Sequence, residues 1–211
     1  MAGILDLLNS DLGKTIISGV AGSTGQDQNK TGALLSMALP VLMQGMKRNA
    51  STPQGAEGLM GALNKHDGSI LDNLDGFFGG GVDDDAVNDG GKILGHVLGN
   101  KQQGVEKILS QKSGIDMASV GNILKVAAPI LMGVLGKQTK QQQVQSPSGI
   151  ENVLGGLLGG NSAKEEQSFL EKILDADGDG SVIDDVAGMV LGGASKKSGL
   201  GGLLGGLFGG K

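Results

Sequence analysis

The chain has 211 residues, a formal net charge of −5, four phenylalanines, and no cysteine, tryptophan or tyrosine. Without cysteine it has no disulfide, no zinc–thiolate site and no thiol nucleophile. The acidic balance, with Arg48 as the single arginine, argues against a nucleic-acid partner. Glycine occupies 41 positions, about a fifth of the chain against roughly 7% in an average protein. Because large aromatic side chains are nearly absent, the core depends on aliphatic side chains and methionine.

The first eleven residues contain neither a basic region nor a continuous apolar run, so we expect no secretory signal. No stretch approaches about 18 uninterrupted apolar residues, and we therefore expect no membrane span. These features predict a cytoplasmic protein. Export by a route without a cleaved signal stays open.

Apolar residues recur at helical spacing, whereas alternating polar and β-branched runs are missing. The longest apolar runs cover residues 33–46 and 120–135, and Gly, Asn, Asp and Ser clusters separate the runs. We predict an all-α fold with a repeat-containing helical domain over 1–137. A Gln/Ser/Pro linker (138–149), a helical segment with an acidic loop (150–194) and a Gly/Leu-rich tail (195–211) follow it.

An internal repeat relates two parts of the first domain at a constant offset of 89 residues. Each copy has a turn glycine, an N-capping aspartate and a proline inside an apolar run: Gly25, Asp27 and Pro40, then Gly114, Asp116 and Pro129. We expect a buried helix after each cap, with a kink at each proline. The pattern predicts a duplicated core helix with no ligand role.

A weaker sequence similarity relates residues 59–63 to residues 93–97, each with a central glycine. We expect Gly61 and Gly95 to lie where another helix approaches closely. The acidic run 83–85, which lies between these segments, lacks the alternating spacing of a metal loop. We interpret it as a solvated loop and helix cap.

Five short motifs occur in an order typical of one family: Ala38-Leu-Pro-Val-Leu, Pro53-x-Gly-Ala-x-Gly-Leu, Ala62-Leu-x-Lys-His-Asp-Gly68, Ile93-Leu-Gly-His96 and Ala128-Pro-Ile-Leu-Met-Gly133. The chain resembles the bacterial domain of unknown function 937 family, which includes YidB-like proteins. The resemblance covers roughly residues 1–137, and a family-like acidic segment follows at 175–185. It implies an all-helical fold, and it transfers no catalytic residue.

The acidic segment is the most chemically specific part of the sequence. Asp175, Asp177 and Asp179 have the spacing of the first, third and fifth positions of an EF-hand loop. Gly180 holds the sixth position, where the loop needs a sharp turn, and Ser181 offers a backbone carbonyl at the seventh. Three carboxylates that converge in this way suit one hard cation.

The end of this loop departs from the EF-hand pattern. Its twelfth position, normally a bidentate glutamate, is Val186, and the nearest acids are at the tenth and eleventh positions. A helix capped by Ser181 without metal is the competing interpretation, and Mg²⁺ or nonspecific cation screening is another. We predict a structural calcium ion held by Asp175, Asp177, Asp179, Ser181, Asp184 and Asp185.

Two Gly/Leu segments share one apolar stripe at an offset of 50 residues: Ile150, Val153, Leu154, Leu157 and Leu158, then Leu200, Leu203, Leu204, Leu207 and Phe208. Glycines in the second segment cost roughly 5 kcal/mol in an isolated helix, so we expect it to be disordered alone. A helix would need a cover: the chain's own core, a second copy or a membrane surface. The single Lys211 and the lack of a basic face weaken the membrane alternative.

No motif in the sequence identifies an enzyme. His66 and His96 could form a proton relay or a metal site with nearby acids, but satisfied or capping histidines explain them better. No P-loop or dinucleotide fingerprint is present. We predict a non-enzymatic helical scaffold or interaction protein that self-associates and carries a calcium loop. The alternatives are a membrane- or envelope-associated factor that acts through its Gly/Leu segments, and a hydrolase that uses either histidine.

Overall fold

The computed structural model describes residues 3–144 and 146–159. By its internal contacts the chain divides into Met1–Asp177 and Gly178–Lys211, and all the described residues lie in the first unit. The described part is helical and contains no strand, which confirms the all-α prediction. The acidic loop at 175–185 and the tail at 195–211 lie outside the described residues.

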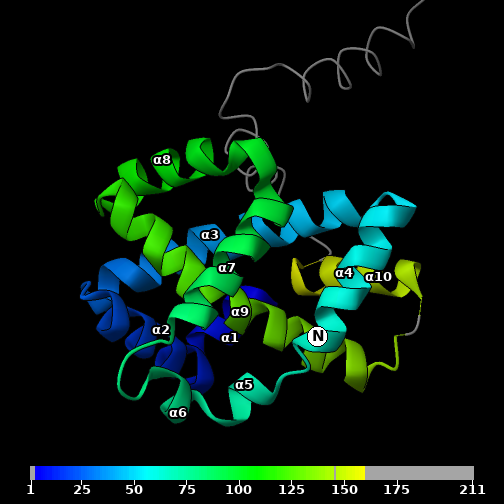
Figure 1. Cartoon of the computed structure of the whole chain (residues 1–211), viewed down its shortest axis with the longest axis horizontal. Coiled ribbons are helices and arrows are strands. Elements are labelled where there is room, and N and C mark those ends of the chain that lie inside the picture. Colours follow the sequence, from blue (N-terminus) through cyan, green and yellow to red (C-terminus); the bar gives the residue numbers. More distant parts are fainter. Residues whose placement is uncertain (1–2, 145, 160–211) are drawn as a thin grey trace, which may run out of the picture. The chain divides into compact units, whose positions relative to one another are not determined.

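The helices follow one another with short connections (Figure 1). In chain order they are α1 (Ile4–Asn9), α2 (Asp11–Thr24), α3 (Gln28–Ala50), α4 (Pro53–Lys65), α5 (Ser69–Asp72), α6 (Leu74–Phe78), α7 (Asp84–Leu98), the 3₁₀ turn η1 (Gly99–Lys101), α8 (Gln102–Ser113), α9 (Met117–Gln141) and α10 (Pro147–Leu157). Helix α9 therefore reaches further than the predicted domain boundary, and residues 142–146 connect it to α10.

The turns that begin α3 and α9 are built alike. Gly25 and Gly114 both adopt the left-handed conformation, with φ of 65° and 66°, which glycine reaches without steric cost. Asp27 then caps α3 by accepting a hydrogen bond from the N–H of residue 30, and Asp116 caps α9 by accepting one from the N–H of Ser119. Both predicted turns and caps are confirmed.

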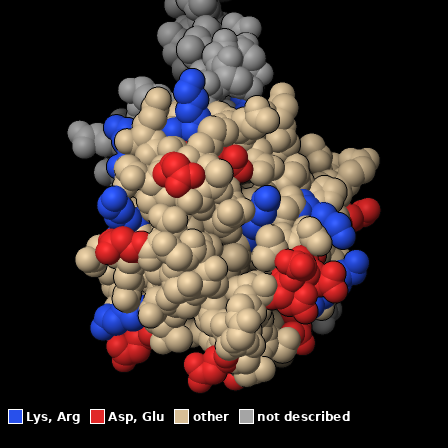
Figure 2. Space-filling model, turned by 60° about the vertical axis from the view of Figure 1, so that its left-hand side comes forward, with Lys and Arg blue, Asp and Glu red and all other residues tan. Residues whose placement is uncertain are grey.

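The core forms around the two helices that follow these caps. Helix α2, which precedes α3, packs against both α3 and α9. Helix α8, which precedes α9, likewise packs against both long helices. Figure 1 shows α9 passing through the middle of the bundle. Helix α9 is long and apolar enough to cross a membrane, but most of its apolar stretch is buried in this core, which accounts for its composition. Figure 2 shows acidic and basic side chains interspersed over one face of the molecule.

Glycines let the helices approach one another at the level of the backbone. Helices α7 and α9 form the most extensive pair, and a Cβ at Gly90 of α7 would collide with the carbonyl oxygen of Lys125 in α9. Pro129 has no N–H to donate to that carbonyl, so the carbonyl is left without its partner within the helix. Gly90 covers this exposed backbone group, which a larger residue could not do.

The expectation for Gly61 and Gly95 was wrong. A Cβ at either position would meet no atom within 4 Å, so neither residue lies at a close helix contact. Both are exposed glycines on helix surfaces. Residues 59–63 and 93–97 resemble each other because apolar residues in both segments line one shared groove.

The segment between α4 and α7 carries the apolar anchor and the acidic cap. Phe77 and Phe78 end the short helix α6 in an edge-to-face contact with ring centroids 5.1 Å apart, and the Phe78 ring lies against Gly19 of α2. The exposed Asp83 then caps α7 by accepting a hydrogen bond from the N–H of Asp85 at 3.0 Å. The interpretation of the acidic run as a solvated cap is confirmed.

Replacement of Gly90 by alanine tests the close approach of α7 to α9. The added methyl group would force the helices apart at Lys125, and we expect a loss of about 1–3 kcal/mol in the free energy of unfolding. This loss corresponds to a melting temperature lower by several degrees, measured by circular dichroism at 222 nm. In the matched control Gly95→Ala, the methyl group meets no atom within 4 Å, and we expect an unchanged or higher melting temperature. Equal melting temperatures for both variants would contradict this account.

Candidate functional site

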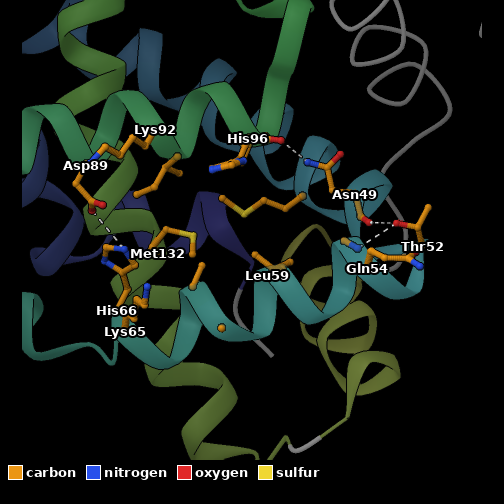
Figure 3. A pocket seen from close by; sticks show the side chains of 17 residues that line it. Asn49, Thr52, Gln54, Leu59, Lys65, His66, Asp89, Lys92, His96 and Met132 are labelled. Atoms are coloured by element: carbon orange, nitrogen blue, oxygen red, sulfur yellow. Dashed lines mark hydrogen bonds and ion pairs between the residues drawn. The ribbon is translucent and has the colours of Figure 1, made fainter.

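An apolar groove of about 640 Å³ lies between α4 and α7 (Figure 3). Residues of α3 and α9 close its bottom, where the methionines Met46 and Met132 lie. Leu59 and Ala62 of α4 face it from one side, and Val97 of α7 from the other. These three side chains are half-buried, so their remaining apolar surface faces the groove.

The wall that α4 contributes is unusually bare because three glycines lie along it. Gly55, Gly58 and Gly61 follow at intervals of three residues and all line the groove. Gly55 is used inside the fold, since its Cβ would collide with the carbonyl oxygen of Asn49 in α3. Gly58 and Gly61 meet nothing within 4 Å, so the space beside them is open. A second helix could therefore approach the α4 backbone directly.

Both walls of the groove are attached to α9, at separate points. Helix α7 is attached where Gly90 meets Lys125, and α4 where Gly136 of α9 meets the carbonyl oxygen of His66. Residues 125 and 136 are eleven positions apart, which corresponds to about 16 Å along a helix axis. Helices α4 and α7 are thus each fixed to a different turn of α9.

Polar contacts join neighbouring helices at both ends of the groove. At one end His66 Nε2 lies 3.3 Å from Asp89 Oδ2, a contact that becomes an ion pair when the imidazole is protonated. At the other end the side-chain amide of Asn49 donates a hydrogen bond of 2.6 Å to the backbone oxygen of His96. Figure 3 shows both contacts on either side of the apolar stretch.

Thr52 has the only hydroxyl group among the residues that line the groove. Its Oγ1 accepts a hydrogen bond from the N–H of Gly55 at 3.1 Å and donates one to the oxygen of Asn49 at 3.2 Å. The hydroxyl therefore caps α4, as expected for a threonine before a proline at the first helical position. It lies at the opposite end of the groove from His66 in Figure 3.

The turn after α4 is held to the end of α9. Asp67 accepts hydrogen bonds from Lys140 Nζ at 2.9 Å and from the N–H of Ser69 at 3.1 Å. These bonds, and above all the one from Lys140, hold the pKa of the Asp67 carboxyl well below its usual range. Gly68 follows with φ of 95°, and a Cβ there would lie 2.8 Å from Cβ of Lys137. The turn thereby fixes the position of His66 at the groove end.

The structure places the two histidines on different elements, and no metal-binding group forms around either of them among the described residues. His66 ends α4 and faces Asp89 of α7, not its sequence neighbour Asp67, which is bonded to Lys140. His96 lies in the last turn of α7. Among residues 3–144 and 146–159, no group of three or more His, Cys, Asp or Glu side chains could hold a metal ion. The predicted calcium ligands at 175–185 lie outside these ranges.

The groove itself was missed by the sequence analysis. A signal was present, since Gly55, Gly58 and Gly61 leave one stripe of α4 without side chains. The same three glycines are part of, or adjoin, the motifs on which the family resemblance depends.

A family model for bacterial proteins of unknown function, DUF937, matches residues 6–138, more than half of the chain. The chain belongs to this family. Every residue that lines the groove lies within the matched region, whereas α10 follows it. No curated protein and no solved structure shows significant similarity to the chain.

The bond between Asp67 and Lys140 makes stability depend on pH. Because the folded pKa of Asp67 is depressed, the stabilisation is present above the unfolded value of about 3.9 and is lost as the pH falls below it. We expect Asp67→Asn to lower the melting temperature at pH 7, by an amount that 1 M salt reduces, since the pair is exposed. The melting temperatures of the wild type and the variant, measured from pH 7 to pH 2, should converge below about pH 4. A constant difference over that range would be inconsistent with this origin.

Proposed function

We propose that this protein is a non-enzymatic helical scaffold or interaction protein that holds an apolar helix in the groove between α4 and α7. The observation that carries the proposal is the open wall at Gly58 and Gly61, beside an apolar bottom formed by buried methionines. We further propose that the protein self-associates, and that its acidic loop binds a structural calcium ion.

The composition of the groove suits a helix better than a small polar ligand. Bare glycine positions permit a second backbone to approach closely, and methionine adapts to apolar partners of different shape. The charged groups Lys65, Lys92 and Asp89 stand among the lining residues, so a partner meets polar groups around an apolar centre. An apolar centre surrounded by a polar rim is typical of protein interfaces.

The polar groups of the groove support a role without catalysis. The single lining hydroxyl, that of Thr52, is used in capping α4. The single His–Asp pair among the described residues, His66 with Asp89, lies at the other end (Figure 3). Nucleophilic catalysis needs a nucleophile within hydrogen-bond reach of its base, and the capped hydroxyl does not supply one.

A membrane- or envelope-associated role is the alternative. Among the described residues the exposed large apolar side chains are Leu5 and Met117, which lie on different helices, α1 and α9. Single exposed apolar residues are normal on water-exposed surfaces and form no membrane-binding face. The described surface therefore favours the interaction protein.

A labelled peptide with the sequence of residues 147–159 is a direct probe of the groove, because this segment forms an apolar helix in the structure. We expect the full chain to bind it, with a rise in fluorescence anisotropy that saturates. The double substitution Gly58→Leu and Gly61→Leu, called the groove variant below, fills the open wall and should weaken binding at least tenfold. The control Gly95→Leu adds the same side chain outside the groove and should bind as the wild type does. Equal affinities for all three proteins would refute the proposed function.

Calcium titration by calorimetry tests the acidic loop separately. We expect binding in the micromolar range or tighter and a higher melting temperature with calcium, because a ligand that binds only the folded state stabilises it. The variant Asp177→Ala, Asp179→Ala removes two of the carboxylates and should lose both effects. Absence of heat with the wild-type protein would leave the loop as a capped helix start.

A further inference from the structure

The two ends of the groove differ in charge. Figure 3 shows Lys65 of α4 and Lys92 of α7 at one end, on opposite walls of the groove. The other end is lined by side chains that are polar but uncharged, those of Asn49, Thr52 and Gln54. Both lysines that line the groove therefore lie at the same end of the apolar stretch.

The two lysines at this end are exposed to solvent. Neither ammonium group forms an ion pair with any residue that the structure describes. The single acidic residue among the lining residues, Asp89, faces His66 with an oxygen–nitrogen distance of 3.3 Å. This end of the groove thus has an excess of positive charge, although the chain as a whole has a net charge of −5.

The length of the α4 wall sets the size of a helix that fits along it. Lining residues extend from Gln54 to Lys65, eleven positions or about 16 Å along the helix axis. A partner helix covers this length with about three turns. Its middle lies over Met46 and Met132 at the bottom of the groove, and its last turn at one end reaches both lysines.

We propose that the groove binds an amphipathic helix of another protein with carboxylate side chains at one end of its apolar stripe, the end that meets Lys65 and Lys92. The carboxylates pair with ammonium groups from both walls, while the stripe covers the apolar bottom. This inference rests on the proposed function and states the chemistry of the partner.

The lysines select and orient the partner more than they hold it. Exposed ion pairs contribute little affinity each, whereas complementary charge excludes partners of the wrong sign and fixes the register. The C-terminal end of a helix carries a partial negative charge, so this end of the partner is favoured beside the lysines. The amide oxygens of Asn49 and Gln54, at the other end, can then accept hydrogen bonds from N–H groups of its first turn.

A fatty acid also combines an apolar chain with a carboxylate, but the shape of the groove favours a helix. A Cβ at Gly58 or Gly61 meets no atom within 4 Å, so the α4 wall leaves space that a single acyl chain does not need. A helix with a diameter of about 10 Å does need that space. Lysines on two opposite walls also suit several carboxylates better than one.

Fluorescence anisotropy of the full chain with two labelled peptides tests the sign of the charge. Each peptide has the sequence of residues 147–159 and an amidated C-terminus, extended there by Glu-Glu (the acidic probe) or by Lys-Lys (the basic probe). We expect the wild-type protein to bind the acidic probe at least tenfold more tightly than the basic probe. In 1 M salt the difference should shrink, because the charged groups are exposed to solvent.

A charge-reversed variant, Lys65→Glu with Lys92→Glu, shows whether these two lysines cause the preference. It should bind the basic probe more tightly than the acidic one, with unchanged helix content by circular dichroism, because both positions are exposed. The control Lys30→Glu with Lys107→Glu changes the net charge equally at exposed positions of α3 and α8 outside the groove. It should keep the preference of the wild type.

Other outcomes overturn the inference in distinct ways. Equal binding of both probes by the wild type, or tighter binding of the basic probe, excludes an acidic partner; the proposed function stands if the groove variant still weakens binding. An acidic preference that survives in the charge-reversed variant does not come from these lysines. Displacement of the acidic probe by decanoate at lower concentration than by unlabelled acidic probe assigns the groove to a fatty acid. Failure of the groove variant to weaken either probe contradicts the inference and the proposed function together.

Discussion

The contact between Gly90 and the backbone of Lys125 sets the arrangement on which the described structure depends. A chain with four phenylalanines and no tryptophan or tyrosine has few large side chains with which to fill space between helices. The helices must therefore approach more closely, and glycine permits this at chosen turns. Pro129 makes the contact specific, because it leaves the carbonyl of Lys125 without a helical donor at the place that Gly90 covers.

The groove follows from this constraint and a second one of the same kind. Gly136 holds the end of α4 against α9, and Gly90 holds α7 against a turn of α9 about 16 Å away. The walls of the groove are thus defined by where glycines occur in α7 and α9. The turn at Asp67 and Gly68 adds a polar attachment at the same end. The groove is thus a consequence of close helix packing at glycines.

Local features were predictable from the sequence, and the groove was not. The turns at Gly25 and Gly114 and the caps at Asp27 and Asp116 depend on residues within a few positions of each other, so their patterns sufficed. Whether a glycine meets another helix depends on residues far away in the sequence. Gly61 was therefore assigned a close contact that the structure gives to Gly90.

The repeat also illustrates this limit, because equal positions in the two copies have different environments. Pro40 leaves the carbonyl of residue 36 without its helical donor, on the exposed side of α3, whereas Pro129 does the same to Lys125 under Gly90. Similarly, Thr31 in α3 corresponds to Val120 in α9, and the fully buried Thr31 hydroxyl has no hydrogen-bond partner. The sequence reveals the duplication, but only the packing shows which copy carries a contact.

The two Gly/Leu segments differ in how strongly their own residues favour a helix. Residues 151 and 152 of α10 are Glu and Asn, and the corresponding residues of the tail are Gly201 and Gly202. Exchange of these residues for glycine costs about 1 kcal/mol of helix stability, roughly a fivefold lower helical population. A helix over the tail sequence would therefore depend more on a covering surface than α10 does. Segments that fold only on contact bind weakly for the area they bury, because part of the interaction energy orders the segment.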